Sequence, residues 1–479
     1  MGGDRKLEVT ICDLKSGIAK AFKVTICDLE ARPECQISAL RFHRTGRGNA
    51  LQCPAQRPRR PPMTATPRDG YDLGLIADTL ERIKRTAQPD GSVSIHDVIA
   101  FTDLRTLIAS AVKLGERLPV PVRRNIIYEA VSAAIRKSGI TAQILLDEIN
   151  KSVANYYKMA EVKYDLVTSV SVSRQRRLRN ATSAGCLVHF PINLNKQHLQ
   201  ARQGVLDDAK HSVFGKLPKH YTLAKVRVVA RSEVEAWERG IDALDLLRAF
   251  WNLALNRGNY WRMSSGKRQP VNRLVLGPIH TLHKTTGELA TDSWWYQNEY
   301  QGPVSEHDPG DSKTEKMFKY AKHAKKYLKR SGYGEHLVTC LLRYVRALDT
   351  PDWEDSYLRL WGVLEQLTNT GLQDNYKVTI RRASSLWKDR KYTQQILAHL
   401  RDYRNMAVHA GAENQDIETY IFQLKRHVEA LIEFHLRNPL RFQTISEATE
   451  FMDLSEDGRE LDRRMRIIKA AKSFHRGSS

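Results

Sequence analysis

The sequence lacks a long apolar run. Nowhere in its 479 residues do apolar side chains continue for the roughly 20 positions that a helix needs to span a bilayer. The first residues, Met1 to Lys6, also lack the apolar core of a secretory signal. We therefore expect a cytoplasmic protein that has no membrane partner.

Cysteine is scarce and irregularly placed. Four of the six cysteines fall within the first 53 residues, and no two form a C-x-x-C pair. We interpret them as reduced thiols, because disulfide frameworks belong to small secreted chains. Phosphate-loop and dinucleotide fingerprints are also missing: Gly266-Lys267 resembles the end of a phosphate loop, but Trp261 occupies the place of the earlier glycine. We expect no cofactor and no metal.

Positive charge is what the sequence has in excess. The formal net charge is +22, and such a chain attracts polyanions, among which nucleic acids are abundant in cells. With 41% hydrophobic and 27% charged residues the chain is expected to be globular. Its length predicts two or three domains, and we expect an α+β multidomain protein.

Residues 1–62 differ from the rest. The hexapeptide VTICDL occurs twice, at 9–14 and 24–29, and arginine, proline and glycine dominate 41–62. Such composition does not form a core, so we expect a disordered basic extension. It is either an arm that contacts nucleic acid or a solvated extension that precedes Met63 as the natural start, and the second reading is favoured.

Residues 63–160 are expected to be a helical region. Leu73, Ile76, Leu80 and Ile83 are spaced as on one face of a helix, and a second apolar face follows at 127–135. Between them, Ser94 and Asp97 have the spacing of a capping box with aspartate in place of glutamate.

Residues 161–305 change period and predict a mixed α+β domain. Alternating residues at 164–172 indicate a strand, as do the segments 187–192 and 226–230. Ser232 and Glu235 then form a capping box that opens a long helix through Leu255. Strand-like sequence returns at 274–276 and at Trp294-Trp295-Tyr296, where we favour core packing over base stacking.

Residues 310–440 predict an all-helical bundle, followed by a charged helical tail at 441–479. Asp352 is placed to cap one helix that stops near Gly371, and the clearest amphipathic helix starts at Ile417 and ends before Pro439. Short connections between such helices favour an antiparallel arrangement.

Three polar residues gather near the end of one of these helices. Asn405 and His409 are four residues apart and share a face, Arg404 flanks that face, and Gly411 is placed to end the helix. Arginine binds two phosphate oxygens at once and keeps its charge, and histidine exchanges a proton near neutral pH. The trio suits RNA cleavage by attack of a 2′-hydroxyl without a metal. The alternative is that two cations merely complement the helix C-terminus.

The segment 403–411, YRNMAVHAG, resembles the R-x4–6-H signature of HEPN domains, and more narrowly of the Apea-like HEPN group. The upstream segment 360–367, LWGVLEQL, is similar to that group's earlier helix. The resemblance implies an all-α domain at 310–440 that dimerises around the motif. It implies that Arg404 and His409 are the catalytic pair, that Asn405 is the polar residue of the motif, and that Glu365 supports Arg404.

The resemblance further implies a metal-independent endoribonuclease in a prokaryotic defence or toxin system, with RNA and a second copy of the chain as partners. The alternative is a HEPN module that binds RNA or protein without turnover. Since one histidine cannot act as base and acid at once, a two-fold dimer supplies the second.

Other candidates have plainer explanations. His280 and His283, three apart in an expected strand, face opposite sides, and Cys340 near His336 falls in an apolar stripe typical of a buried thiol. Two basic segments, 174–179 and 319–326, are placed to follow an RNA backbone; a solvated helix face explains the second equally well.

Overall fold

The computed structural model describes residues 65–476 except 88–92, 96, 115–117, 213–216, 258–267, 298–299, 301, 303, 372–375 and 411–415. The repeated hexapeptide and the basic extension at 1–62 therefore lie outside the described residues. The chain forms two compact units. The first comprises residues up to Leu166, Arg227–Gly240 and Thr281–Asn298; the second comprises Val167–Val226, Ile241–His280 and the chain from Glu299 onward.

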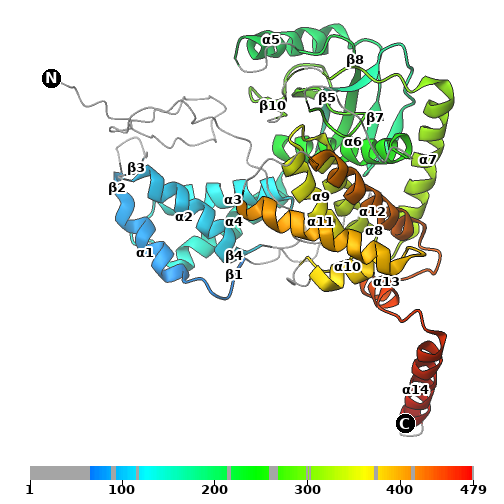
Figure 1. Ribbon diagram of the computed structural model, residues 1–479. Helices are drawn as coiled ribbons and strands as arrows, with labels where there is room; N and C mark the ends of the chain where they lie inside the picture. Colours follow the sequence, from blue (N-terminus) through cyan, green and yellow to red (C-terminus); the bar gives the residue numbers. More distant parts are fainter. Residues whose placement is uncertain are drawn as a thin grey trace. The chain divides into compact units, whose positions relative to one another are not determined.

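Four helices around one apolar core make up most of the first unit. They are α1 (Leu73–Ile83), α2 (Val98–Ala111), α3 (Val120–Ala134) and α4 (Ala142–Lys158), and Figure 1 shows them in blue and cyan. Two short ribbons flank them: β1 (Thr66–Pro67) pairs with β4 (Val112–Lys113), and β2 (Lys84–Ala87) with β3 (Val93–Ile95). The helix predicted from the spacing of Leu73, Ile76 and Leu80 is confirmed as α1, which buries those three side chains.

The predicted capping box at Ser94 is wrong. Ser94 lies in strand β3, and Asp97 itself caps α2 by accepting a hydrogen bond from the Ala100 amide at 2.8 Å. Aspartate and serine are both good N-cap residues, and spacing alone does not tell which of them starts the helix.

A six-stranded sheet has the order β10-β9-β5-β8-β7-β6. Its strands are β5 (Val162–Ser173), β6 (Ala181–Ser183), β7 (Cys186–His189), β8 (Tyr221–Ala230), β9 (Ile279–Lys284) and β10 (Trp295–Tyr296). The three strands predicted from 164–172, 187–192 and 226–230 are confirmed as β5, β7 and β8. Because β5 lies inside the sheet, its residues 164–168 are all buried, although the sequence there alternates.

Two helices accompany the sheet, α5 (Lys196–Ser212) and α6 (Glu233–Leu255). The predicted cap of α6 by Ser232 is confirmed, since Ser232 Oγ accepts from the Glu235 amide at 3.3 Å. The Glu235 carboxylate accepts from the Arg231 amide at 2.6 Å, one residue before the Ser232 amide that a capping box uses.

Among the described residues, eight helices follow the sheet, and all belong to the second unit. They are α7 (Gly310–Arg330), α8 (Gly334–Asp349), α9 (Trp353–Leu367), α10 (Tyr376–Ser384), α11 (Arg390–Ala410), α12 (Ile417–Arg437), α13 (Ile445–Met452) and α14 (Gly458–Arg476). Helix α9 packs against α8, α11 and α12, as Figure 1 shows in yellow to brown. The mixed α+β class expected from the sequence is confirmed.

The predicted start of α9 and the predicted end of α12 are confirmed. Asp352 caps α9 by accepting from the Asp355 amide at 2.9 Å. Helix α12 ends at Arg437, and its C-cap Asn438, with a left-handed φ of 39°, directly precedes Pro439. Helix α9 ends at Leu367, earlier than the stop expected near Gly371. Among the described residues, none of the helices combines the length and apolar character required to cross a membrane.

A buried ion network joins α6 to α8 within the second unit. The Arg248 side chain is fully buried and donates to Asp245 at 2.6 Å, to Asp349 at 2.8 Å and to the Leu274 carbonyl at 2.9 Å. Arg346 binds the other oxygen of Asp245 at 2.8 Å. Burial alone would lower the pKa of Arg248, but the two carboxylates raise it. The guanidinium therefore stays charged and holds both helices.

Arg248→Ala is expected to lower the free energy of unfolding by about 3–5 kcal/mol, because it leaves two carboxylates without their buried partner. Urea unfolding of the full chain measures the loss. Arg330→Ala, which removes an exposed arginine at the end of α7, serves as the control and is expected to change stability by less than about 0.5 kcal/mol. A loss below about 1 kcal/mol for Arg248→Ala would contradict the role of the network.

Three histidines of the second unit are buried in a neutral form. Burial lowers the pKa of His280 and of His427 to about 3 and that of His435 to about 4. His435 accepts from the Tyr333 hydroxyl at 3.1 Å and donates to the Leu367 carbonyl at 2.9 Å, which requires the proton to sit on Nε2 alone.

These histidines make stability depend on pH. Since the folded pKa lies below the unfolded value of ~6.5, stability is present above that value and falls as the pH drops toward 4. Each such histidine lowers stability by about 2 kcal/mol between pH 7 and 5. We expect His435→Asn to lose about 2 kcal/mol less than the parent over that range, measured by urea unfolding at both pH values. Parallel pH profiles would contradict the assignment.

Candidate functional site

Helix α11 carries the cluster predicted from the sequence, and a tyrosine wedge fixes its C-terminal half. The Tyr403 ring is buried between Tyr357 of α9 and Tyr420 of α12, with ring centroids at 5.0 and 4.8 Å. The Tyr357 hydroxyl donates to the Leu400 carbonyl of α11 at 2.6 Å. Because Tyr403 is anchored on both sides, the next residue, Arg404, points away from this core.

The Arg404 side chain is half-buried and held by two neighbours. Its guanidinium carbon lies 5.2 Å from the centroid of the Tyr376 ring on α10. Its Nη1 donates to Asn405 Oδ1 at 3.4 Å, a long hydrogen bond. A guanidinium over an aromatic face is attracted by the ring while its N–H groups stay available to an anion. The structure therefore brings together Arg404 and Asn405, two of the predicted site residues.

Glu365 is tied to this place through aromatic side chains. Its carboxylate accepts from Trp361 Nε1 at 2.8 Å, one turn earlier on α9. The Trp361 ring lies 6.4 Å from the Tyr376 ring, and Tyr376 in turn lies under Arg404. The chain of contacts runs from Glu365 to Arg404 by way of two rings, and direct electrostatic support of Arg404 by Glu365 stays a prediction.

His409 belongs to α11 by its backbone, one turn after Asn405. Its side chain lies outside the described residues, as does Gly411, which was expected to end the helix. The convergence of the His409 imidazole with Arg404 therefore stays a prediction.

The histidine pairs weighed as metal sites make hydrogen bonds within the fold. His280 Nδ1 is 2.7 Å from the Thr168 hydroxyl, and the two ring nitrogens of His283 contact Thr281 Oγ1 and the Gly287 carbonyl. His336 Nε2 donates to the Gln366 carbonyl at 3.0 Å, and the Cys340 thiol is buried. Within the described ranges, no group of three or more histidine, cysteine, aspartate or glutamate side chains is arranged to hold a metal ion.

The aromatic run near 295 is part of the packing. The Trp295 ring stacks on Trp237 of α6 with centroids 5.3 Å apart and an interplanar angle of 9°. This contact explains the run as packing, as favoured from the sequence.

The two basic segments differ in their partners. Arg176 pairs with Asp308 and Asp311, and Arg179 pairs with Glu315 at 2.8 Å, so two arginines of the first segment are already neutralised. On α7 the exposed Lys319 and His323 of the second segment have no ion-pair partner among the described residues.

Sequence reasoning missed Tyr376 as part of the site. The residue is 28 positions before Arg404, on a separate short helix, and no local spacing relates the two. The four-residue interval between Trp361 and Glu365 on one helix was the available signal for their hydrogen bond.

Comparison with known proteins finds no matching family model, no similar curated protein and no similar solved structure. The assignment of residues 310–440 to the HEPN group therefore stays a prediction from the sequence.

The tyrosine wedge provides a matched pair of substitutions. The Tyr403 hydroxyl is buried without a hydrogen-bond partner among the described residues, whereas that of Tyr357 is bonded to Leu400. Tyr357→Phe is expected to cost about 1 kcal/mol of unfolding free energy, and Tyr403→Phe to be neutral or stabilising. Urea unfolding of both variants measures this, and a larger loss for Tyr403→Phe would show that its hydroxyl is bonded.

Proposed function

We propose that the chain is a metal-independent endoribonuclease of the HEPN type that works as a homodimer. A role in a prokaryotic defence or toxin system is part of the proposal and rests on the resemblance of the 403–411 segment alone. One observation carries the chemistry: a half-buried guanidinium, held over Tyr376 and bonded to Asn405, lies on the same helix as His409 and five residues before it.

The arrangement suits binding of a phosphodiester. The ring of Tyr376 and the amide of Asn405 limit the conformations of Arg404, so less side-chain entropy is lost when it binds. Negative charge builds on the phosphate oxygens as the 2′-hydroxyl attacks, and a guanidinium placed in advance stabilises that charge. Arg404 is the catalytic residue that stabilises the developing negative charge, and Asn405 positions its side chain.

Proton transfer falls to His409. During cleavage the 2′-oxygen bonds to phosphorus, the bond to the 5′-oxygen breaks, and the products are a 2′,3′-cyclic phosphate and a free 5′-hydroxyl. One histidine takes the proton of the 2′-hydroxyl, and a second gives one to the leaving 5′-oxygen. We propose that a two-fold dimer supplies the second histidine from the partner chain.

A non-catalytic HEPN module that binds RNA is the alternative. It is favoured by the exposed and unpaired cations of α7, which suit binding of a polyanion without any chemistry. An assay of RNA cleavage separates the nuclease from the binding module.

The full chain is expected to cut single-stranded RNA with EDTA present. Arg404→Ala and His409→Ala are each expected to lower the cleavage rate by about 100-fold or more, because each removes charge stabilisation or proton transfer. A labelled RNA resolved on a denaturing gel measures the rate. Lys391→Ala, which removes an exposed cation at the other end of α11, is the control and is expected to cut at the parent rate.

Two outcomes would count against the nuclease. Cleavage that needs a divalent metal and survives both substitutions would exclude this mechanism, and RNA binding without cleavage would favour the module. Expression of the parent and of His409→Ala in cells, with total RNA analysed alongside, covers a nuclease that a cellular trigger activates. Loss of RNA integrity in the parent alone is then expected.

A further inference from the structure

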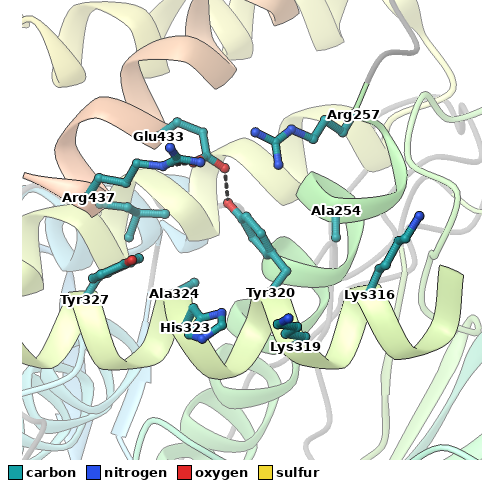
Figure 2. A pocket seen from close by; sticks show the side chains of 11 residues that line it. Ala254, Arg257, Lys316, Lys319, Tyr320, His323, Ala324, Tyr327, Glu433 and Arg437 are labelled. Atoms are coloured by element: carbon teal, nitrogen blue, oxygen red, sulfur yellow. Dashed lines mark hydrogen bonds and ion pairs between the residues drawn. The ribbon is translucent and has the colours of Figure 1, made fainter. Parts of the chain in front are cut away.

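A basic cavity lies on the second unit, away from the tyrosine wedge of α11. Its volume is about 360 Å³, and its walls come from α7, from α12 and from the end of α6 (Figure 2). Ligand pockets generally start at about 300 Å³, so this one has room for a single nucleotide and is larger than a simple anion needs.

Basic side chains are the commonest kind in the lining. Lys316, Lys319 and His323 come from α7, and Arg257 follows α6 on the opposite side (Figure 2). All four are exposed, and none has an ion-pair partner among the described residues. Exposed side chains without partners are free to bind an incoming anion at little structural cost.

The carboxylate in the lining, Glu433, is already engaged. It accepts from the Tyr320 hydroxyl at 2.6 Å and from Arg437 Nε at 2.9 Å. Burial, followed by the charge of Glu433, raises the pKa of Tyr320, so the phenol stays a neutral donor. The carboxylate therefore offsets Arg437 and leaves the other four basic side chains uncompensated.

The basic side chains on α7 form a row. Lys316, Lys319 and His323 are three and four residues apart, which places them on one helix face, and three residues advance about 4.5 Å along the axis. A row of this kind offers successive contacts along an extended polyanion. Tyr327, 39% exposed, continues the same face and presents a ring of the type on which bases stack.

We propose that this cavity binds the phosphate backbone of single-stranded RNA, with one nucleotide in the cavity and its neighbours along α7. Lys316, Lys319 and Arg257 contact the phosphates, and Tyr327 stacks on a base. The proposal rests on the proposed function for the identity of the strand as RNA, but it does not require cleavage. It assigns to α7 a binding surface separate from Arg404 and Asn405.

The test uses the full chain and a fluorescein-labelled 2′-O-methyl oligoribonucleotide, which cannot be cut because its 2′-oxygens are blocked. Fluorescence polarisation at ~50 to ~200 mM salt gives the Kd and its salt slope. Lys316→Glu with Lys319→Glu is expected to raise Kd about tenfold or more and to reduce the slope by about 1.4, as expected for two lost contacts to a single strand.

The matched control is Lys388→Glu with Lys391→Glu, two exposed lysines outside the cavity, which changes net charge equally. It is expected to bind as the parent does. An equal loss in both double variants, or no loss in the first, would overturn the proposal. The probe resists cleavage, so the binding result does not depend on nuclease activity. If the parent cuts no RNA and binding is still lost only in the cavity variant, the nuclease is refuted and this site is not.

Unlabelled AMP and inorganic phosphate distinguish a strand from a free phosphate compound. We expect neither to displace the labelled strand when its concentration equals that of the strand's phosphates, since each offers one contact where the strand offers several. Displacement by AMP at that concentration would overturn the strand as occupant and identify a free nucleotide instead.

Discussion

The buried guanidinium of Arg248 is the constraint on which the second unit depends. It lies on the long helix α6, between strands β8 and β9 in the chain, and its carboxylate partner Asp349 ends helix α8. A buried charge must keep its partners, so the two helices cannot move apart without a large cost. Helix α9 packs on α8, and α11 packs on α9, so the position of Arg404 traces back to this pairing.

The packing of Tyr403 then orients α11 within that framework. The Tyr403 ring lies between Tyr357 and Tyr420, and these contacts limit rotation of α11 about its axis. The adjacent Arg404 then lies beside Tyr376, and its direction follows from burial of its neighbour. The proposed RNA-directed role is supported by this orientation and by the exposed lysines of α7, which lie on a different helix and suit a polyanion.

Local patterns predicted most of the elements, because amphipathic spacing and end signals act within a few residues. The helix at Leu73, the strand at 164–172 and the caps at Ser232 and Asp352 follow from such patterns. The capping box predicted at Ser94 was wrong because Ser94 and Asp97 are both suitable N-cap residues near the same helix start. Contacts between distant segments were beyond this reasoning: the charged residues of α6 give no sign of burial, and Tyr376 gives none of lying under Arg404.

The carboxylate at the cavity has a consequence for selectivity. Because Glu433 holds Arg437 and the Tyr320 hydroxyl together, an anion that takes either group must compete with a resident one. A ligand that binds Arg437 or the Tyr320 hydroxyl therefore replaces the Glu433 carboxylate with its own negative group. We expect a weakly charged molecule to gain too little at that wall to displace Glu433, so Arg437 and the Tyr320 hydroxyl would be open only to a ligand of high negative charge density.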